Sequence, residues 1–340
     1  TSQIGTLVRL RTDEGLQGWG EITPLGATYL PAYAAGVRTD IQFLANHLLG
    51  HDPTNISAIN VLMRDVLMGH SYAKSAIDIA CWDLKGQALG VPLSTLMGGV
   101  LQESFPLYEA VPLGSPEYMA DFVTMRSAAG INRFQLKVGN EPLVDAARTR
   151  ATREAANEDA TIIADSNGGW NLLDARRAMN AMAGLEVLVE QPCRTTADSI
   201  LASRNSALPL VLDESIVTLD DVFEAKQAAH VSSINIKLSR VGGLTGAVRM
   251  RDVMQELNLM VSVEDMWGGD VITAAVSHVA ATTRPEKLLN VSFFNDWTDG
   301  HVAGYLPRSN NGRGAAPTAP GLGITVDVDR LGSPLFSVDA

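Results

Sequence analysis

The sequence predicts an α/β barrel preceded by a smaller α+β domain, and three observations support this. Six apolar segments each end in a chargeable residue, the spacings between these residues are nearly constant, and residues before about 98 do not share the period. The spacings of 28, 25, 23, 24 and 27 residues fit one strand, one helix and two short loops. Charge directly after an apolar strand is typical of the carboxyl-end face of such a barrel. The six terminal residues are Lys137, Asp165, Glu190, Asp213, Lys237 and Glu264.

Residues 1–98 are expected to form the α+β domain. Residues 6–22 alternate apolar and polar side chains around a DEG turn, which predicts a hairpin. Helical periodicity follows over 34–49, 55–68 and 71–90, and Gly90 and Pro92 close the last helix. The first strand of this hairpin looks like the second strand of a larger sheet. We therefore expect further residues before Thr1.

Residues 99–294 are expected to form the barrel, with a first strand over 105–113 and an eighth over 288–294. Capped helices alternate with the strands, as in 115–130, which opens with Ser115 and Pro116 and closes at Gly130. This alternation indicates a parallel sheet. Residues 295–340 are rich in turn-forming residues and are expected to return to the first domain.

The composition narrows the class of protein. The 340 residues carry a formal charge of −12, which argues against a nucleic-acid partner because phosphate binding needs clustered Lys and Arg. No apolar run approaches the roughly 20 residues that span a bilayer, so we expect no membrane partner. Two distant cysteines, Cys81 and Cys193, do not make a disulfide framework, and a reducing cytoplasm is the expected location.

Asp165, Glu190 and Asp213 end three consecutive strands, where neighbouring strand ends lie about 5 Å apart. Carboxylates this close repel one another unless a cation lies between them. Oxygen ligands favour Mg²⁺, so the three residues are predicted to bind Mg²⁺. The competing interpretation, that each acid only caps the following helix, suits one such residue better than three.

Lys137 and Lys237 flank the three carboxylates. A lysine next to a metal ion and another cation is shifted toward the neutral amine and can act as a base. Two lysines on opposite sides of a bound carboxylate could reach both faces of its α-carbon, one removing a proton and the other returning one. The competing interpretation is that each lysine is a surface charge or forms an ion pair with a neighbouring carboxylate.

These residues also carry a family resemblance. The motifs FQLKVG, ADSNGGW, EQPC, LDES, INIKLSRVGGLTGA and EDMWGGD, together with TDEGLQGWGE and PGLGI, resemble the enolase superfamily and its muconate lactonizing enzyme subgroup. The resemblance implies a modified TIM barrel of (β/α)7β type under an α+β capping domain. It also implies Mg²⁺, a small carboxylate substrate, a homo-oligomer and a first step that removes the proton α to the carboxylate. Asp165, Glu190 and Asp213 match the metal ligands, and Lys137 and Lys237 match the acid/base pair.

Two positions differ from the usual pattern. Gln135 stands where an outer lysine is common, and we expect Gln135 and Asn167 to support the ligands from behind. The seventh strand ends in Glu264-Asp265 without the histidine of mandelate racemase-like members, so a lysine–lysine mechanism is expected. His278 is interpreted as a helix residue.

The segment GATYLPAYAAGVR, the QLK variant at 135–137 and EDMWGGD together resemble a narrower group, the epimerases of hydroxyproline betaine and proline betaine, with the cis-3-hydroxyproline dehydratases close by. We therefore expect a racemase or epimerase of an amino-acid derivative, acting in amino-acid catabolism. The alternatives are a hydroxyproline dehydratase or a muconate-type cycloisomerase on the same scaffold. A barrel without activity would require the loss of one of the three predicted metal ligands or of one of the two lysines. All five residues are present. The expected substrate contacts, from aromatic faces and a carboxylate, are Tyr29, Glu264, Asp265, Trp267 and Phe293.

Overall fold

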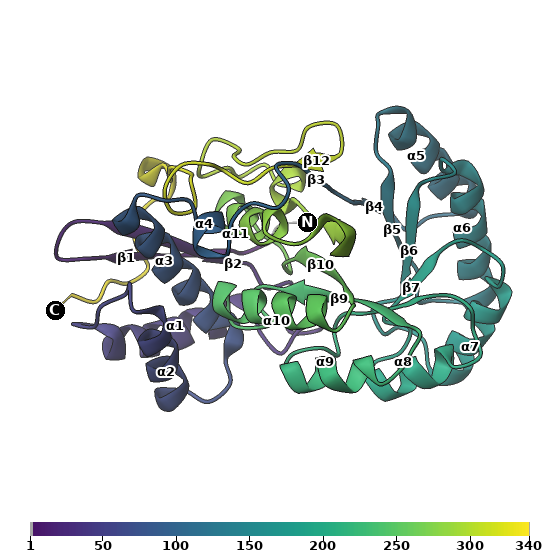
Figure 1. Ribbon diagram of the computed structural model, residues 1–340, viewed down its shortest axis with the longest axis horizontal. Helices are drawn as coiled ribbons and strands as arrows, with labels where there is room; N and C mark the ends of the chain where they lie inside the picture. The colour runs from purple at the N-terminus through teal and green to yellow at the C-terminus, as the bar shows by residue number, and fades with distance from the viewer. Residues whose placement is uncertain (1–2, 340) are drawn as a thin grey trace.

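The computed structural model describes residues 3–339 and contains a capping domain and a barrel, which lie side by side in Figure 1. The capping domain begins with an antiparallel hairpin, β1 (Thr6–Arg11) and β2 (Gln17–Ile22), in which Thr6 pairs with Ile22. Four helices follow: α1 (Ala34–Leu48), α2 (Ile56–Val66), α3 (Ser71–Leu89) and α4 (Leu93–Leu96). The predicted hairpin and helices are therefore present.

Glycines allow β2 to lie directly on α3. A Cβ atom at Gly20 would lie 1.8 Å from the Ala76 carbonyl oxygen, and one at Gly18 would lie 2.3 Å from that of Ala80. Any side chain at these two positions would push the strand off the helix. The GWG motif is thus a packing requirement of the capping domain.

The barrel contains eight parallel strands, and each pairs with its neighbours in chain order from β4 to β11. The Tyr108 amide, just before β4, donates a 3.0 Å hydrogen bond to the Val291 carbonyl of β11, which brings the two ends of the sheet together. The predicted fold class is confirmed. The strands are β4 (Glu109–Val111), β5 (Arg133–Lys137), β6 (Thr161–Asp165), β7 (Leu188–Glu190), β8 (Leu210–Leu212), β9 (Val231–Lys237), β10 (Met260–Glu264) and β11 (Leu288–Val291).

Helices cover the outside of the sheet, and α5 to α8 fan around it in Figure 1. Most begin with a side-chain cap, as expected from the sequence; Ser115 accepts the Tyr118 amide at the start of α5. The helices are α5 (Pro116–Ala128), α6 (Pro142–Ala155), α7 (Leu172–Ala181), α8 (Thr196–Ser203), α9 (Leu219–Lys226), α10 (Leu244–Glu256) and α11 (Asp270–Ala281).

Two segments differ from the predicted strands. The first expected strand is split into β3 (Phe105–Pro106), which pairs with β12 (Arg313–Gly314), and β4. The eighth ends at Val291 instead of 294, and Phe294–Trp297 form a 3-10 helix, η2. This turn places Phe294 and Trp297 against Trp267 above the barrel.

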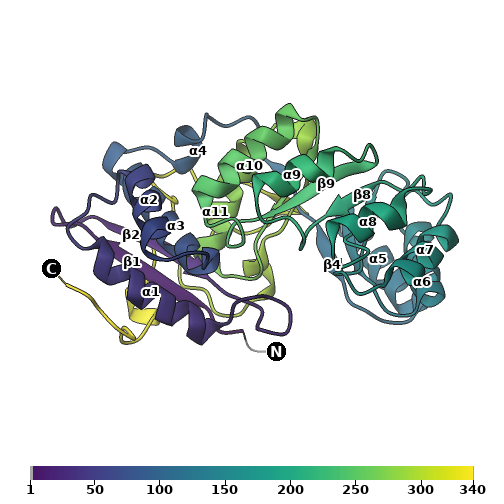
Figure 2. The ribbon, with the colours of Figure 1, turned by 90° about the horizontal axis from the view of Figure 1, so that it is seen from below.

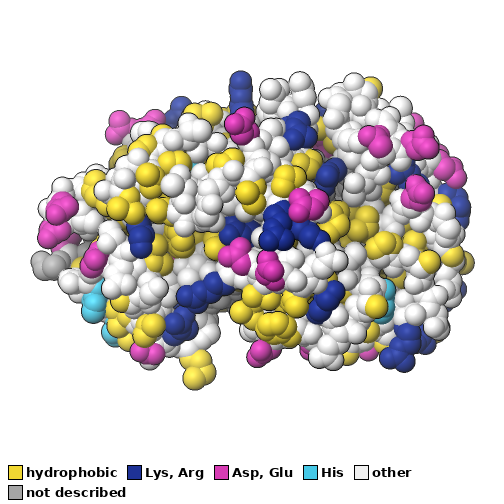
Figure 3. All heavy atoms as spheres, viewed as in Figure 1, with side chains coloured by type: hydrophobic (Ala, Val, Ile, Leu, Met, Phe, Trp, Pro, Cys, Tyr) yellow, Lys and Arg dark blue, Asp and Glu magenta, His cyan; other side chains and the backbone are white. Residues whose placement is uncertain are grey.

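The segment after the barrel runs back along the capping domain, and Figure 2 shows its end beside α1 and β1. The Leu322 amide donates to Asp83 of α3 at 2.8 Å, and Phe336 packs on the apolar cluster of the capping domain. The remaining short elements are η1 (Pro285–Lys287) and η3 (Val328–Arg330). Within residues 3–339, no helix combines the length and apolar character that crossing a membrane requires. Acidic and basic side chains are interspersed on the face shown in Figure 3.

Candidate active site

The six chargeable residues that end the apolar segments meet at one edge of the sheet. Lys137 pairs in register with Asp165, Asp165 with Glu190, and Lys237 with Glu264. Asp213 directly follows β8, whose Val211 pairs with Glu190. The four carboxylates are buried, so their charges must be matched within the protein or by a ligand.

The two lysines approach the carboxylates from opposite sides. Lys137 Nζ lies 2.5 Å from Asp165 Oδ2, and Lys237 Nζ lies 2.7 Å from Asp213 Oδ2. Lys237 also lies 3.1 Å from Glu264 Oε1. The Lys137 side chain is 39% exposed and that of Lys237 only 9%, so one lysine borders solvent and the other is enclosed.

Glu190 lies between these ion pairs and is held by neutral groups. Asn235 donates to Oε1 at 2.6 Å and Gln135 donates to Oε2 at 3.1 Å. Burial, followed by the charges of Asp165 and Asp213, raises the pKa of Glu190 well above its usual value. By contrast, burial would raise the pKa of Asp213, but Arg240 and Lys237 lower it to about 2. Glu190, at the centre of the site, therefore has no positively charged partner among these hydrogen bonds.

A hard divalent cation would supply that charge, and carboxylate oxygens are its preferred ligands. Within residues 3–339, however, no three acidic, histidine or cysteine side chains already converge on one point as metal ligands. Asp165 and Asp213 bind Lys137, Lys237 and Arg240 instead. The residue types and their adjacent strand ends fit Mg²⁺, while the expected convergence of the three carboxylates is not preformed.

The lysine protonation state also differs from the expectation. Burial alone would lower the pKa of Lys137, but Asp165 and Glu190 outweigh it and the pKa is raised. Burial would also lower the pKa of Lys237, yet Asp213 and Glu264 raise it well above its usual value. In this arrangement both lysines are ammonium ions. A neutral amine requires the carboxylates to be engaged by another cation.

The capping domain reaches the site through Tyr29. The Tyr29 hydroxyl donates to Glu214 Oε1, and Asn167 Nδ2 donates to the same oxygen at 2.9 Å. The Asn167 backbone amide donates to Asp165 Oδ1 at 2.8 Å, so Asn167 contacts a predicted metal ligand directly. Burial and the charges of Asp213 and Asp165 raise the pKa of Glu214 to about 7.

Aromatic side chains border the opposite side of the site. The Tyr108 hydroxyl donates to Glu264 Oε2, and Tyr108 lies edge-on to Trp297 with ring centroids 6.2 Å apart. Trp267 stacks on Phe294 at 5.1 Å and lies 6.0 Å from Trp297. Glu264 and Trp267 therefore lie together at the barrel mouth.

Two expected substrate contacts have other surroundings. Phe293 is buried in the outer core, edge-on to Phe105 at 5.9 Å, because it alternates with Ser292 along the chain; its neighbour Phe294 joins the aromatic cluster. Asp265 accepts hydrogen bonds from the Ser239 amide, at 3.0 Å, and hydroxyl. Asp265 therefore holds the loop after β9, and its contact with the substrate stays a prediction.

Four residues at the site were not foreseen: Tyr108, Glu214, Asn235 and Arg240. Asn235 lies two residues before Lys237 on the same face of β9, so strand alternation alone could have found it. Glu214 and Arg240 lie in the LDES and INIKLSR motifs, one and three residues after site residues. Tyr108 carries no comparable signal, because its role depends on closure of the barrel onto β11.

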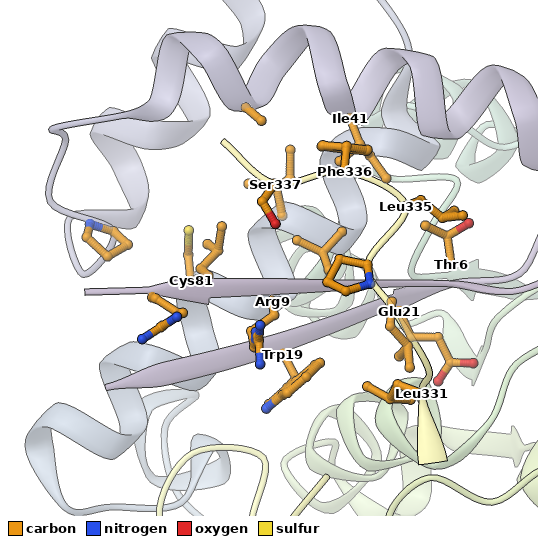
Figure 4. A pocket seen from close by; sticks show the side chains of 18 of the residues that line it. Thr6, Arg9, Trp19, Glu21, Ile41, Cys81, Leu331, Leu335, Phe336 and Ser337 are labelled. Atoms are coloured by element: carbon orange, nitrogen blue, oxygen red, sulfur yellow. The ribbon is translucent and has the colours of Figure 1, made fainter. Parts of the chain in front are cut away.

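A cavity of about 1910 Å³ lies mainly in the capping domain, and none of the predicted metal ligands or lysines lines it. Figure 4 shows it between the hairpin, α1 and the C-terminal segment, with Trp19, Ile41 and Phe336 on its walls. Glu21 borders this cavity and accepts hydrogen bonds from the Gly269 and Ile272 amides at the start of α11. The capping domain thus holds the loop that carries Trp267.

Comparison with known proteins places this geometry in a family. A model described as "Enolase C-terminal domain-like" matches residues 117–330. A second, "Mandelate racemase / muconate lactonizing enzyme, N-terminal domain", matches residues 1–98. The chain belongs to the mandelate racemase/muconate lactonizing enzyme family of the enolase superfamily.

Members of this family with different reactions resemble the chain over most of its length. A cis-3-hydroxy-L-proline dehydratase from Roseibium aggregatum is 44% identical over 97% of this chain and 90% of its own. An N-succinyl-L-Arg/Lys racemase from Bacillus cereus is 30% identical over 96% of this chain and 88% of its own. A mandelate racemase/muconate lactonizing enzyme from Roseovarius nubinhibens, crystallised with magnesium, superimposes with a TM-score of 0.94 at 34% identity, covering 98% of this chain and 94% of that one. These similarities favour the dehydratase alternative over the epimerase that we expected first.

Proposed function

We propose that this enzyme is a Mg²⁺-dependent dehydratase that removes water from a cyclic β-hydroxy amino acid of the 3-hydroxyproline type. The observation that carries the proposal is the 44% identity over 97% of the chain to a cis-3-hydroxy-L-proline dehydratase. The buried carboxylates and the two lysines supply the chemistry that this reaction needs.

Asp165, Glu190 and Asp213 are the residues that would hold Mg²⁺. Bound there, Mg²⁺ would stabilise the negative charge that grows on the substrate carboxylate as the α-proton leaves. Gln135, Asn235 and Asn167 orient the carboxylates from behind, each through a hydrogen bond of 3.1 Å or less.

The lysines act on the substrate from opposite sides. One lysine, as the neutral amine, accepts the α-proton. The electron pair of the broken C–H bond forms a carbon–carbon double bond, and the β-hydroxyl leaves with a proton as water. The substrate therefore loses one hydrogen and one hydroxyl, and the resulting enamine can isomerise to a cyclic imine.

A proton NMR assay tests the proposal. Purified enzyme with Mg²⁺ is expected to convert cis-3-hydroxy-L-proline, in D₂O, to a product that lacks the signals of the α-proton and of the proton on the hydroxyl-bearing carbon. Trans-4-hydroxy-L-proline is the control, because its hydroxyl is not β to the carboxylate carbon and cannot be eliminated in this way. Intact substrate under these conditions would contradict the proposal.

The second candidate is a racemase or epimerase, favoured by the placement of Lys137 and Lys237 on opposite sides of the carboxylates. Such an enzyme would incorporate deuterium at the α-carbon and invert it without releasing water. The same NMR assay separates the two reactions, because only inversion retains the hydroxyl group.

A further inference from the structure

Charged and neutral side chains are unevenly distributed in the interior of the barrel mouth. Five charged residues, Lys137, Asp165, Glu190, Asp213 and Lys237, lie on β5 to β9. On β9 to β11 and just beyond, one carboxylate, Glu264, lies beside four neutral side chains, Asn235, Ser262, Asn290 and Ser292, all 3% exposed or less. We call these four neutral residues the neutral row.

The register of the strands places the neutral row on one face. Ser262 pairs with Asn235 on one side and with Asn290 on the other. Ser292 lies two residues beyond Asn290, and its neighbours Val291 and Phe293 are in the outer core. Because side chains alternate along an extended chain, Ser292 faces inward, close to the level of Glu264.

Each member of the neutral row has a buried polar atom without a protein partner. These atoms are Asn235 Oδ1, Ser262 Oγ, Asn290 Oδ1 and Ser292 Oγ. A buried polar atom without a hydrogen bond is costly, and a cluster of four on three adjacent strands points to a polar ligand group.

We propose that Ser292, at the mouth of the neutral row, binds the departing hydroxyl group of the substrate. The inference rests on the proposed dehydratase function and assigns one substrate group to one part of the site. A hydroxyl group both donates and accepts hydrogen bonds, as do serine and asparagine side chains. Ser292 only hydrogen-bonds to the leaving oxygen and is unchanged when the substrate gives up its α-hydrogen and hydroxyl as water.

The charges of the site favour this orientation of the substrate. A substrate carboxylate is attracted to the lysines and to a cation held by the three carboxylates, and a ring ammonium is attracted to Glu264. The hydroxyl is the remaining polar group and carries no charge. It is matched by the uncharged side chains of the neutral row.

The test compares Ser292→Ala with Ser75→Ala. Ser75 is also buried with an unpartnered hydroxyl, but it lies in α3 of the capping domain. The measurements are kcat/KM for cis-3-hydroxy-L-proline and the inhibition constant of L-proline, which has the same ring and carboxylate without the hydroxyl. Ser292→Ala is expected to lower kcat/KM about tenfold and to change the inhibition constant less than twofold, since one neutral hydrogen bond is lost. Ser75→Ala is expected to change neither by more than about twofold.

Two results would overturn the inference: an unchanged kcat/KM in Ser292→Ala, or an equal loss for both ligands, which would indicate general distortion of the site. Circular dichroism checks that the variant folds. If wild-type enzyme binds cis-3-hydroxy-L-proline without dehydrating it, the proposed function fails, and calorimetric binding of the two ligands to Ser292→Ala still tests the neutral row. In that case a preserved preference for the hydroxylated ligand would exclude Ser292.

Discussion

Two buried polar regions of this enzyme are built on opposite principles. At the barrel mouth, carboxylates crowd together and are matched by side-chain charges from Lys137 and Lys237. At the joint between capping domain and barrel, Glu21, Asp83 and His278 are matched by fixed backbone groups. Asp83 accepts the Trp19 and Leu322 amides at 2.9 and 2.8 Å. A backbone partner cannot be exchanged for a ligand, whereas an ammonium can, so the first region can bind and react while the second only holds the domains together.

His278 shows the joint most clearly. Its Nδ1 accepts the Ser94 amide of α4 at 3.2 Å, and its Nε2 donates to the Leu322 carbonyl at 3.1 Å. One imidazole thus connects the capping domain, the barrel helix α11 and the C-terminal segment. It requires the neutral ring, because a protonated Nδ1 cannot accept the amide hydrogen.

The largest effect is expected from Lys237→Met at the barrel mouth. Removing the proposed acid/base group, which Asp213 and Glu264 enclose, should lower kcat/KM about 10³-fold, within the range for general acid–base catalysis. Exposed Lys226 on α9 is the control, and Lys226→Met should retain full activity. Activity is followed as dehydration and as deuterium exchange; unchanged exchange in Lys237→Met would assign the α-proton to Lys137.

The next effect is the pH dependence of stability that His278 causes at the joint between the capping domain and the barrel. Burial lowers the pKa of His278 from 6.5 to about 4, so its contribution to stability is complete above pH 6.5 and is lost as the pH falls from 6.5 through 4. The full loss is about 3 kcal/mol, because each pKa unit corresponds to about 1.4 kcal/mol. Urea unfolding between pH 7 and 4 should show a steeper decline for wild type than for His278→Gln. A variant at exposed His51, His51→Gln, should decline like wild type; equal slopes for all three would exclude this role.

The next effect is the change in stability caused by Mg²⁺ binding at the barrel mouth. Mg²⁺ at 100 times its Kd is expected to stabilise wild type by about 2.7 kcal/mol, measured as a rise in the melting temperature that EDTA reverses. Glu190→Gln should lose this rise, and without metal it should be at least as stable as wild type because one crowded carboxylate is gone. The matched change at exposed Glu224, Glu224→Gln, should keep the rise. A full Mg²⁺ effect in Glu190→Gln would remove Glu190 from the metal site.

The smallest effect is expected from Asp83→Asn in the joint. Both Asp83 oxygens accept backbone amides, so the new NH₂ group would face a donor and reduce the free energy of unfolding by about 1–2 kcal/mol. None of the hydrogen-bond partners of Asp83 is a charged residue of the barrel mouth. We therefore expect kcat/KM to stay within about twofold of wild type. Asp65→Asn on the exposed face of α2 is the control for both measurements. A large loss of activity with normal stability would show that the joint also shapes the active site.

Several parts of the fold were predictable because they depend on local rules. Strand ends followed apolar runs, helix starts followed caps such as Ser115, and Gly90 ended α3 in a left-handed conformation. The split of the first strand and the early end of β11 were not predictable, since both depend on β12 and on aromatic packing from distant segments.

The candidate site divides in the same way. Periodic spacing alone predicted that Lys137, Asp165 and Glu190 lie together, because parallel strands in register place their carboxyl ends at one edge of the sheet. Periodic spacing could not predict the surroundings of Phe293 and Asp265. The position of the strand end and the contacts of the following loop decide which side chain faces the barrel mouth. Tyr108 was missed because only barrel closure brings it to Glu264.

The order of residues along the chain by itself determined the barrel, the capping domain and the set of charges at the barrel mouth, since these depend on periodicity and on residue type. Only the tertiary structure decided how those charges are paired, which aromatic rings border them and where the neutral row lies. The physical reason is range: periodicity and capping act over a few residues, whereas the protonation of a buried lysine and the satisfaction of a buried hydroxyl depend on groups that folding brings from far along the chain.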